Sequence, residues 1–235
     1  MVRYAKLPLH FDATAVQEEL LRAGGRWAAH LNTYHYTGSW TVLSLRSPGG
    51  RHDNIIPELQ GNGTGFIDTI HMHDFPSVKK LLSAFQCPIM SARFLNLRPG
   101  AVIKQHRDLE LALEKGEARL HFPVITNPDV EFYCEGERIC LNEGECWYLN
   151  ANIPHRVSNL GMTDRIHLVV DLTVNDWLID LIHSSSQISR GEDPGDIHAL
   201  QIIEQLRQQN TAESIRIADL WEKQLLEKRN LTNTA

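Results

Sequence analysis

The sequence contains few cysteines, and none of them stand in the CxxC pairs that structural zinc sites normally use. The cysteines are Cys87, Cys134, Cys140 and Cys146. The last three recur every six residues through strand-like segments. We therefore expect ordinary reduced thiols, partly buried, as in a cytosolic protein.

Basic charge and long hydrophobic runs are also scarce. The formal net charge is -6 and the sequence pI about 6.0, which argues against a protein that binds nucleic acid irrespective of its sequence. No apolar run approaches the roughly 20 residues needed to span a bilayer, so we expect no membrane partner. The first residues, MVRYAKLPLHFDA, lack the apolar core of a signal peptide, and we expect a cytoplasmic location.

The composition is otherwise that of an ordinary folded protein. Hydrophobic residues make up 42 % and charged residues 22 % of the chain, which predicts that most of it is ordered. A length of 235 residues suffices for one large domain with a modest appendage. We predict a domain over residues 1–172 and a helical C-terminal extension over residues 173–235.

The pattern of apolar residues changes twice along the chain. Before residue 91 it predicts helices over 13–23 and 77–85, and a long Gly- and Pro-rich loop over 47–65 that serves either as a lid over a pocket or as a plain flexible excursion. From 91 to 172, short strand-like segments alternate with turn residues, a pattern typical of a β-sandwich or barrel. The helical period then returns, and residues 197–230 predict a helical hairpin that packs on the core or serves a partner.

A His-x-Asp pair ends one predicted strand, in KQHRDLELAL (104–113). His106 and Asp108 are two residues apart, so in an extended segment both side chains lie on the same side. His155, in NANIPHRVSN, follows 49 residues after His106, a distance over which antiparallel strands can bring it back alongside. Two histidines and one carboxylate are the facial ligand set of non-haem iron(II) oxygenases, which leaves positions open for a 2-oxo acid and dioxygen.

Arg165 stands ten residues after His155, in TDRIHLVVDL. We predict that residues 155–159 and 165–171 form the two arms of a hairpin with its turn near Gly161. The guanidinium of Arg165 then returns to His155, where it can hold a carboxylate through two parallel hydrogen bonds.

Further polar residues interrupt two apolar strands. His167 shares the face of Arg165 by the two-residue period of a strand. In EARLHFPV, Arg119 and His121 share one face, whereas their neighbours are apolar. An inward-facing pair of this kind indicates a pocket lined for anions, and a rim position in contact with water alone is the alternative.

Taken in order, these motifs resemble a known family. HRD, RLHFPV, GECWYLNANIPHRVSN and DRIHLVVDL are similar to motifs of the aspartyl/asparaginyl β-hydroxylase-like branch of the iron(II)/2-oxoglutarate dioxygenases, near the bacterial proline cis-hydroxylases and other free-amino-acid hydroxylases. The resemblance covers roughly residues 91–172 and extends weakly to Trp40. It implies a mainly β fold, a double-stranded β-helix (a cupin-like jelly roll) with flanking N-terminal helices, and it leaves the C-terminal helices outside the common core.

The resemblance also implies roles for individual residues. It implies that His106, Asp108 and His155 bind Fe(II) and that Arg165 holds the distal carboxylate of the cosubstrate 2-oxoglutarate. Arg119 and His121 match the strand that in relatives faces the cosubstrate or substrate, so the resemblance implies that they line the pocket.

The activity that the resemblance implies is hydroxylation of an unactivated C–H bond with Fe(II), 2-oxoglutarate and dioxygen. The vertebrate β-hydroxylase lacks the carboxylate ligand, whereas this chain has Asp108, so the chain is more similar to the bacterial enzymes that act on amino acids or amino-acid-like small molecules. Asn150 stands where relatives often have Asp, and we assign it no role.

Other functions fit parts of the same pattern. A metal-dependent cupin enzyme that does not use 2-oxoglutarate would have no need of Arg165. A non-catalytic metal-binding sensor would use the C-terminal helices as its output or as a homodimer interface. A hydroxylase of an Asp or Asn residue in a peptide would need a longer groove.

Some residues compete for a place in the site. His71 and His73 form a rival HxH pair, although no arginine follows them at the matching distance. Arg46 is able to hold a substrate carboxylate but is more typical of a surface arginine. Trp40 and Trp147 are more typical of core packing than of a substrate platform.

Overall fold

The computed structural model describes residues 1–55, 65–192 and 194–233. Contacts divide the chain into two compact units, Val2–Ser189 and Met1 together with Arg190–Ala235, which are described separately. The domain boundary after residue 172 stays a prediction, and residues 56–64 of the expected loop lie outside the described residues. Within the described part of the chain, no helix is both long enough and apolar enough to cross a membrane.

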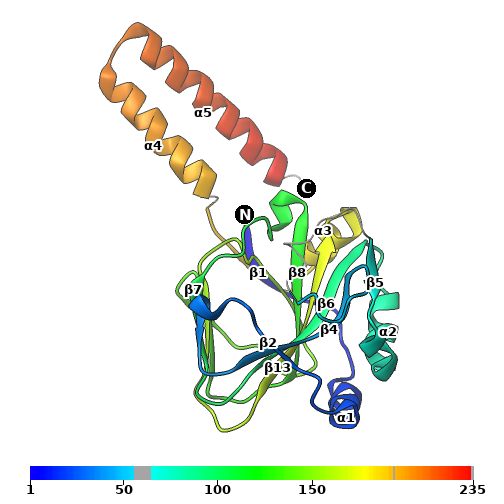
Figure 1. The fold of residues 1–235 in the computed structure, drawn as a ribbon. Coiled ribbons are helices and arrows are strands. Elements are labelled where there is room, and N and C mark those ends of the chain that lie inside the picture. The colour runs from blue at the N-terminus through cyan, green and yellow to red at the C-terminus, as the bar shows by residue number, and fades with distance from the viewer. Residues whose placement is uncertain (56–64, 193, 234–235) are drawn as a thin grey trace. The chain divides into compact units, whose positions relative to one another are not determined.

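Two β-sheets built from antiparallel pairs face each other in the first unit (Figure 1). The larger has the strand order β14-β1-β11-β8-β13-β6-β4-β2, with β5 paired to β4, and the smaller has the order β10-β9-β12-β7-β3. This mainly β jelly roll confirms the predicted fold class. The strands of the larger sheet are β1 (Val2–Leu7), β2 (Ala28–Ala29), β4 (Trp40–Pro48), β5 (Phe66–Asp68), β6 (Ile89–Leu97), β8 (Glu117–Ile125), β11 (Cys146–Leu149), β13 (Arg165–Thr173) and β14 (Gln187–Arg190). Those of the smaller are β3 (Tyr36–Thr37), β7 (Val102–His106), β9 (Val130–Cys134), β10 (Glu137–Ile139) and β12 (His155–Asn159).

Three helices cover the outer face of the larger sheet, α1 (Ala13–Ala23), α2 (Pro76–Ser83) and α3 (Asp176–His183) (Figure 1). The first two confirm the helices predicted over 13–23 and 77–85. Side-chain caps begin two of the helices: Asp12 accepts from the amide of Ala15 and Asn175 from that of Leu178. Short 3-10 turns complete the unit at η1 (Thr33–His35), η3 (Ile70–Asp74) and η4 (Leu113–Lys115).

The two-residue period of β13 explains how one strand serves both the core and the barrel interior. Alternate residues belong to the hydrophobic core beneath the helices, namely Ile166, Leu168, Val170 and Leu172. The residues between them, Arg165, His167, Val169 and Asp171, therefore face the other sheet. Strand β8 follows the same rule, with Leu120 and Phe122 in the core and Arg119 facing the barrel interior.

The hairpin predicted between residues 155–159 and 165–171 is wrong. Strand β12 pairs with β7 and β9 in the smaller sheet, whereas β13 pairs with β6 and β8 in the larger. The chain crosses from one sheet to the other between these strands. Sequential strands of a jelly roll do this because each sheet must bury one face against the other.

The second unit contains the predicted helical hairpin, formed by α4 (Pro194–Gln209) and α5 (Ala212–Asn233). Its own apolar core is small: Ile203, Ala218 and Leu225 are buried, and Ala199 and Leu206 pack against them. Large apolar side chains such as Leu220, Trp221 and Leu226 are more than a third exposed.

Candidate metal centre

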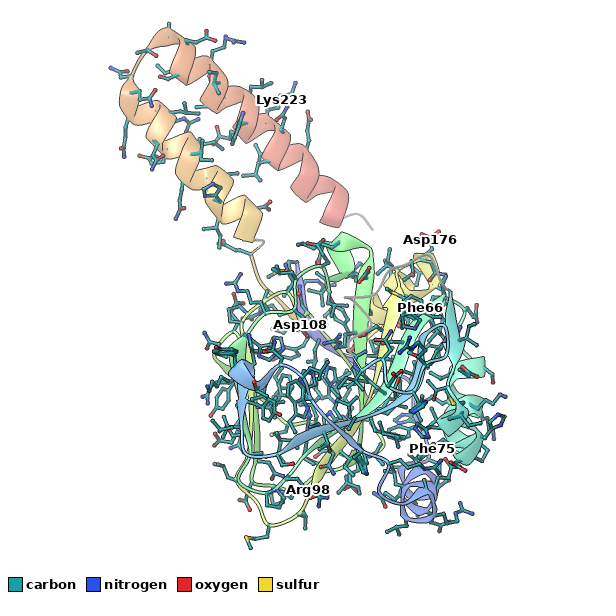
Figure 2. The ribbon with its side chains drawn as sticks, in the orientation of Figure 1. Phe66, Phe75, Arg98, Asp108, Asp176 and Lys223 are labelled. Carbon is teal, nitrogen blue, oxygen red and sulfur yellow. The ribbon has the colours of Figure 1, made fainter. Side chains whose placement is uncertain are left out.

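Strand pairing brings the predicted metal ligands together. His106 is the last residue of β7 and His155 the first of β12, and the two are directly opposite each other in the ladder between these strands. One ligand atom from each of His106, Asp108 and His155 lies within 4.8 Å of the others. The two imidazole rings are 4.2 Å apart, and Nε2 of His106 is 3.6 Å from Oδ1 of Asp108. Figure 2 labels Asp108 in the region between the two sheets.

Both imidazoles are oriented for metal binding. Nδ1 of His106 lies 2.8 Å from the carbonyl oxygen of Lys104, and Nδ1 of His155 lies 3.0 Å from that of Ile153. A carbonyl only accepts, so Nδ1 carries the hydrogen and Nε2 keeps its lone pair. Burial and the neighbouring His106 lower the pKa of His155 to about 4, so this imidazole is neutral at pH 7.

Asp108 is ionised because of its neighbours. Burial opposes ionisation of the carboxyl, but the Arg119 guanidinium outweighs this effect and lowers the pKa of Asp108. Arg119 donates a short hydrogen bond to Oδ2. The backbone amide of Asp108 also donates to the carbonyl of Ala151, which holds the segment after β7 in place. Two imidazoles and a carboxylate suit a divalent first-row metal ion.

A buried ionic network supports Asp108. Arg119 donates to both oxygens of Asp171, at 2.7 and 3.1 Å, and Arg93 donates to Oδ2 of Asp171 at 2.9 Å. Ser91 donates to the same oxygen at 2.8 Å. Burial opposes the charge of Asp171, but the two guanidinium groups lower its pKa far below the usual range.

Sequence reasoning did not find Arg93 and Asp171. The signal was available in the two-residue period: Asp171 continues the inward series of Arg165 and His167 in RIHLVVDL, and Arg93 follows Ser91 on one face of SARFLNL. A charged residue on the inward face of a strand requires a partner of opposite charge, and here Arg93 and Asp171 are partners of each other.

Arg165 lies deep in the barrel, opposite Leu97 in the ladder and toward the end that Arg98 marks in Figure 2. It is 2 % exposed, and burial lowers its pKa to about 9. Its Nη2 lies 2.9 Å from Nδ1 of His167, and its Nε has no hydrogen-bond partner among the described residues. A buried guanidinium with no carboxylate bonded to it within the described chain fits a carboxylate ligand, such as the distal group of 2-oxoglutarate.

His121 lies between the metal ligands and Arg165. Its ring is 5.8 Å from that of His167 and 6.1 Å from that of Phe132, and its Nδ1 has no hydrogen-bond partner among the described residues. Burial and the charge of Arg165 hold its pKa well below the usual value. Phe132 stacks on His155 at 6.4 Å and lies 6.0 Å from the Arg165 guanidinium, so one ring spans the distance between metal site and arginine.

A central cavity with about 530 Å³ of empty space contains these groups. Its lining includes the three candidate metal ligands, Arg119, His121 and Arg165, the residues that the sequence placed in the site. An outer cavity with about 1150 Å³ adjoins it, and both are lined by His106, Asp108 and Arg119. The two cavities therefore adjoin at His106, Asp108 and Arg119, and the lining of the central one includes Arg165.

Trp40 forms part of the wall between the two cavities, a role that its assignment to core packing did not include. It is 8 % exposed and stacks on His30 with ring centroids 3.6 Å apart. Burial and the charge of Arg93 lower the pKa of His30 to about 4, so a neutral imidazole lines the outer cavity.

The competing residues lie elsewhere. Arg26 contacts Nδ1 of His71, and neither this histidine nor His73 lines the central or outer cavity. Arg46 pairs with Asp68 at 2.8 Å. Trp147 is core, as expected, with its Nε1 donating to Glu145. Asn150 also lines the cavity, but its amide donates to the carbonyl of Val2, which ties the loop before His155 to β1.

Comparison with models of known families matches residues 11–174 to the family described as aspartyl/asparaginyl beta-hydroxylase. The chain belongs to the aspartyl/asparaginyl β-hydroxylase family. This confirms the family that the sequence motifs resemble. A curated relative is an L-proline cis-4-hydroxylase of Rhizobium meliloti (strain 1021), 26 % identical over 136 residues, or 57 % of this chain and 48 % of the relative. The chain thus spans about half the length of that relative.

Two solved structures illustrate what parts of this chain are similar to. One is an oxidoreductase of the 2OG-Fe(II) oxygenase family from Burkholderia pseudomallei, with 15 % identity, a TM-score of 0.45 and coverage of 72 % of this chain and 85 % of that one. Another is a Pseudomonas putida prolyl-4-hydroxylase, with 10 % identity, a TM-score of 0.43 and coverage of 74 % and 94 %.

Proposed function

We propose that this β-hydroxylase-family protein is an Fe(II)- and 2-oxoglutarate-dependent dioxygenase that hydroxylates an unactivated C–H bond of a free amino acid or a small amino-acid-like molecule. One observation carries the proposal: a facial set of two imidazoles and a carboxylate shares a cavity with a buried guanidinium whose Nε has no partner among the described residues. A cupin enzyme without a dicarboxylate cosubstrate would have no use for Arg165 in that position.

Three side chains would hold the metal, His106 and His155 through Nε2 and Asp108 through a carboxylate oxygen. When bound, the ferrous ion with 2-oxoglutarate and dioxygen supplies the oxidising chemistry, and the protein supplies orientation and a closed site. Arg119 keeps Asp108 ionised and directs it, because it bonds Asp108 and Asp171 at the same time.

Arg165 would orient the cosubstrate from the opposite end of the cavity. Its guanidinium can bind the distal carboxylate of 2-oxoglutarate while the 2-oxo acid end faces the metal ligands. The cavity is lined on this path by the rings of Phe132 and His121. Apolar and neutral walls of this kind exclude water and strengthen the ionic contact at Arg165.

The outer cavity is suited to a substrate that carries a carboxylate. Arg93 and Arg119 line it beside Asp108. Guanidinium groups in the wall of a cavity attract a carboxylate and bind it through charge-assisted hydrogen bonds. The curated relative is named for an amino acid, L-proline, which agrees with this class of substrate.

The Arg165→Ala variant tests the proposal. We expect the variant to keep its metal affinity and to bind 2-oxoglutarate more weakly by about 2–5 kcal/mol, or about 30- to 5000-fold, because one partner of a buried charge pair is lost. Calorimetric titrations of Fe(II) and of 2-oxoglutarate without oxygen measure the two separately. Arg22→Ala, an exposed arginine of α1, is the matched control. Unchanged 2-oxoglutarate affinity in Arg165→Ala would refute the assignment.

An assay of succinate release over the twenty amino acids tests the substrate class. We expect turnover to depend on the presence of at least one of them. If none of the twenty amino acids leads to succinate release in a protein that binds Fe(II) and 2-oxoglutarate, the result would favour a sensor or a peptide substrate.

A further inference from the structure

A third hollow lies at the edge of the smaller sheet. It has about 1270 Å³ of empty space and is lined by residues of β10, of the loop between β8 and β9, and of the segment that follows β10. We call it the side groove. Its buried end is formed by Phe132, Arg165 and His167. The first two of these also line the central cavity, so the two hollows meet at Arg165.

His167, a lining residue of the side groove, holds a buried donor without an acceptor among the described residues. Arg165 donates from Nη2 to Nδ1 of His167, and a guanidinium only donates, so the neutral imidazole carries its hydrogen on Nε2. His167 is 1 % exposed, and its Nε2 has no partner among the described residues, as is also true of Nε of Arg165. A buried donor without an acceptor costs about 1–3 kcal/mol. His167 lines the side groove and not the central cavity, so an acceptor for Nε2 would come from the groove.

The other residues of the groove indicate which kind of acceptor would fit beside His167. Arg138 lies at the exposed rim, and Glu143 is the acidic residue of the lining. The carboxylate of Glu143 already accepts hydrogen bonds from Thr126 and Gln17. Arg138 and Glu143 thus contribute one charge of each sign to the lining, whereas Arg165 and His167 at the buried end are hydrogen-bond donors. Its side walls include the apolar residues Val130, Ile139 and Leu141.

We propose that the side groove binds a short aliphatic carboxylate, whose oxygens accept from Nε2 of His167 and from Arg165 and whose tail contacts the apolar walls. This inference rests on the proposed function, in which Arg165 also binds 2-oxoglutarate from the other side. Two anions that share one guanidinium weaken each other's binding. Occupancy of the groove therefore lowers the affinity for 2-oxoglutarate, and 2-oxoglutarate lowers the affinity of the groove by the same factor.

Sodium butyrate is the probe. We expect the dissociation constant of 2-oxoglutarate, measured by calorimetry on the full Fe(II)-loaded chain without oxygen, to rise about five- to tenfold at saturating butyrate, within the usual range of coupling between sites. Sodium chloride at equal ionic strength is the control. In protein without 2-oxoglutarate, we expect butyrate to slow alkylation of Cys140. This residue lines the groove and its thiol is exposed, whereas Cys87, Cys134 and Cys146 are buried.

Cys140 also allows the groove to be blocked. We expect the N-ethylmaleimide adduct of Cys140 to bind 2-oxoglutarate with unchanged affinity and to lose the butyrate effect, whereas Cys140→Ser treated in the same way keeps it. A butyrate effect that persists in the adduct places butyrate in the central cavity and overturns the proposal. The proposal is also overturned if butyrate has no effect on the unmodified protein, or if the adduct binds 2-oxoglutarate poorly without butyrate. If 2-oxoglutarate does not bind at all, the proposed function fails, and protection of Cys140 by butyrate still decides whether the groove binds a carboxylate.

Discussion

Asp171 holds two buried guanidinium groups in place, so its charge is expected to be worth several kcal/mol to the fold. The Asp171→Asn variant keeps the shape of the side chain but leaves Arg93 and Arg119 without the anion that they share. Removing one partner of a buried ion pair typically costs about 3–5 kcal/mol, because the other charge stays buried and uncompensated. We expect a loss of that size in the free energy of unfolding at pH 7, measured by urea titration of the metal-free protein.

The pH dependence separates this mechanism from a packing defect. The pKa of Asp171 is lower in the folded than in the unfolded state, so its contribution is present above the unfolded pKa of about 3.9 and is lost as the pH falls toward the folded value. The difference between wild type and Asp171→Asn is therefore expected to narrow below about pH 4. Asp53→Asn, which removes an exposed partner of Arg51, is the control and is expected to change little.

Two results would refute this account of Asp171. A variant that loses the same free energy at pH 7 and at pH 3.5 would show that packing and not charge is lost. A variant of wild-type stability at pH 7 would show that Arg93 and Arg119 reach water or another anion when Asp171 is neutral.

Other predictions concern separate parts of the molecule. Burial lowers the folded-state pKa values of His121, His155 and His167, so unfolding takes up protons below about pH 6.5. The metal-free protein should therefore lose stability as the pH falls from 6.5 to 5, by up to about 1.4 kcal/mol for each histidine and each pH unit. A urea midpoint that stays constant over this pH window would contradict the prediction. Thiol titration of the native protein should find one fast-reacting cysteine, Cys140, with the other three reacting only in denaturant. The homodimer through the C-terminal helices stays a prediction: light scattering should detect a dimer that Trp221→Glu dissociates, and a monomeric wild type would rule it out.

Much of the candidate site could be predicted from local sequence. Extended segments place residues two apart on one face whatever their partners, so His106 with Asp108, Arg119 with His121 and Arg165 with His167 could be paired from spacing alone. The same period, read further along β13, would have included Asp171.

Tertiary structure decided which strands meet, and with them the parts of the site that have no local signal. The side-chain period does not reveal that β12 and β13 belong to opposite sheets, because either pairing buries the same apolar residues. The sharing of Asp171 by Arg93 and Arg119 and the place of Trp40 between two cavities arise only when β4, β6, β8 and β13 lie side by side. Spacing along the chain therefore determined which side chains point inward, and packing of the two sheets determined what each of them meets there.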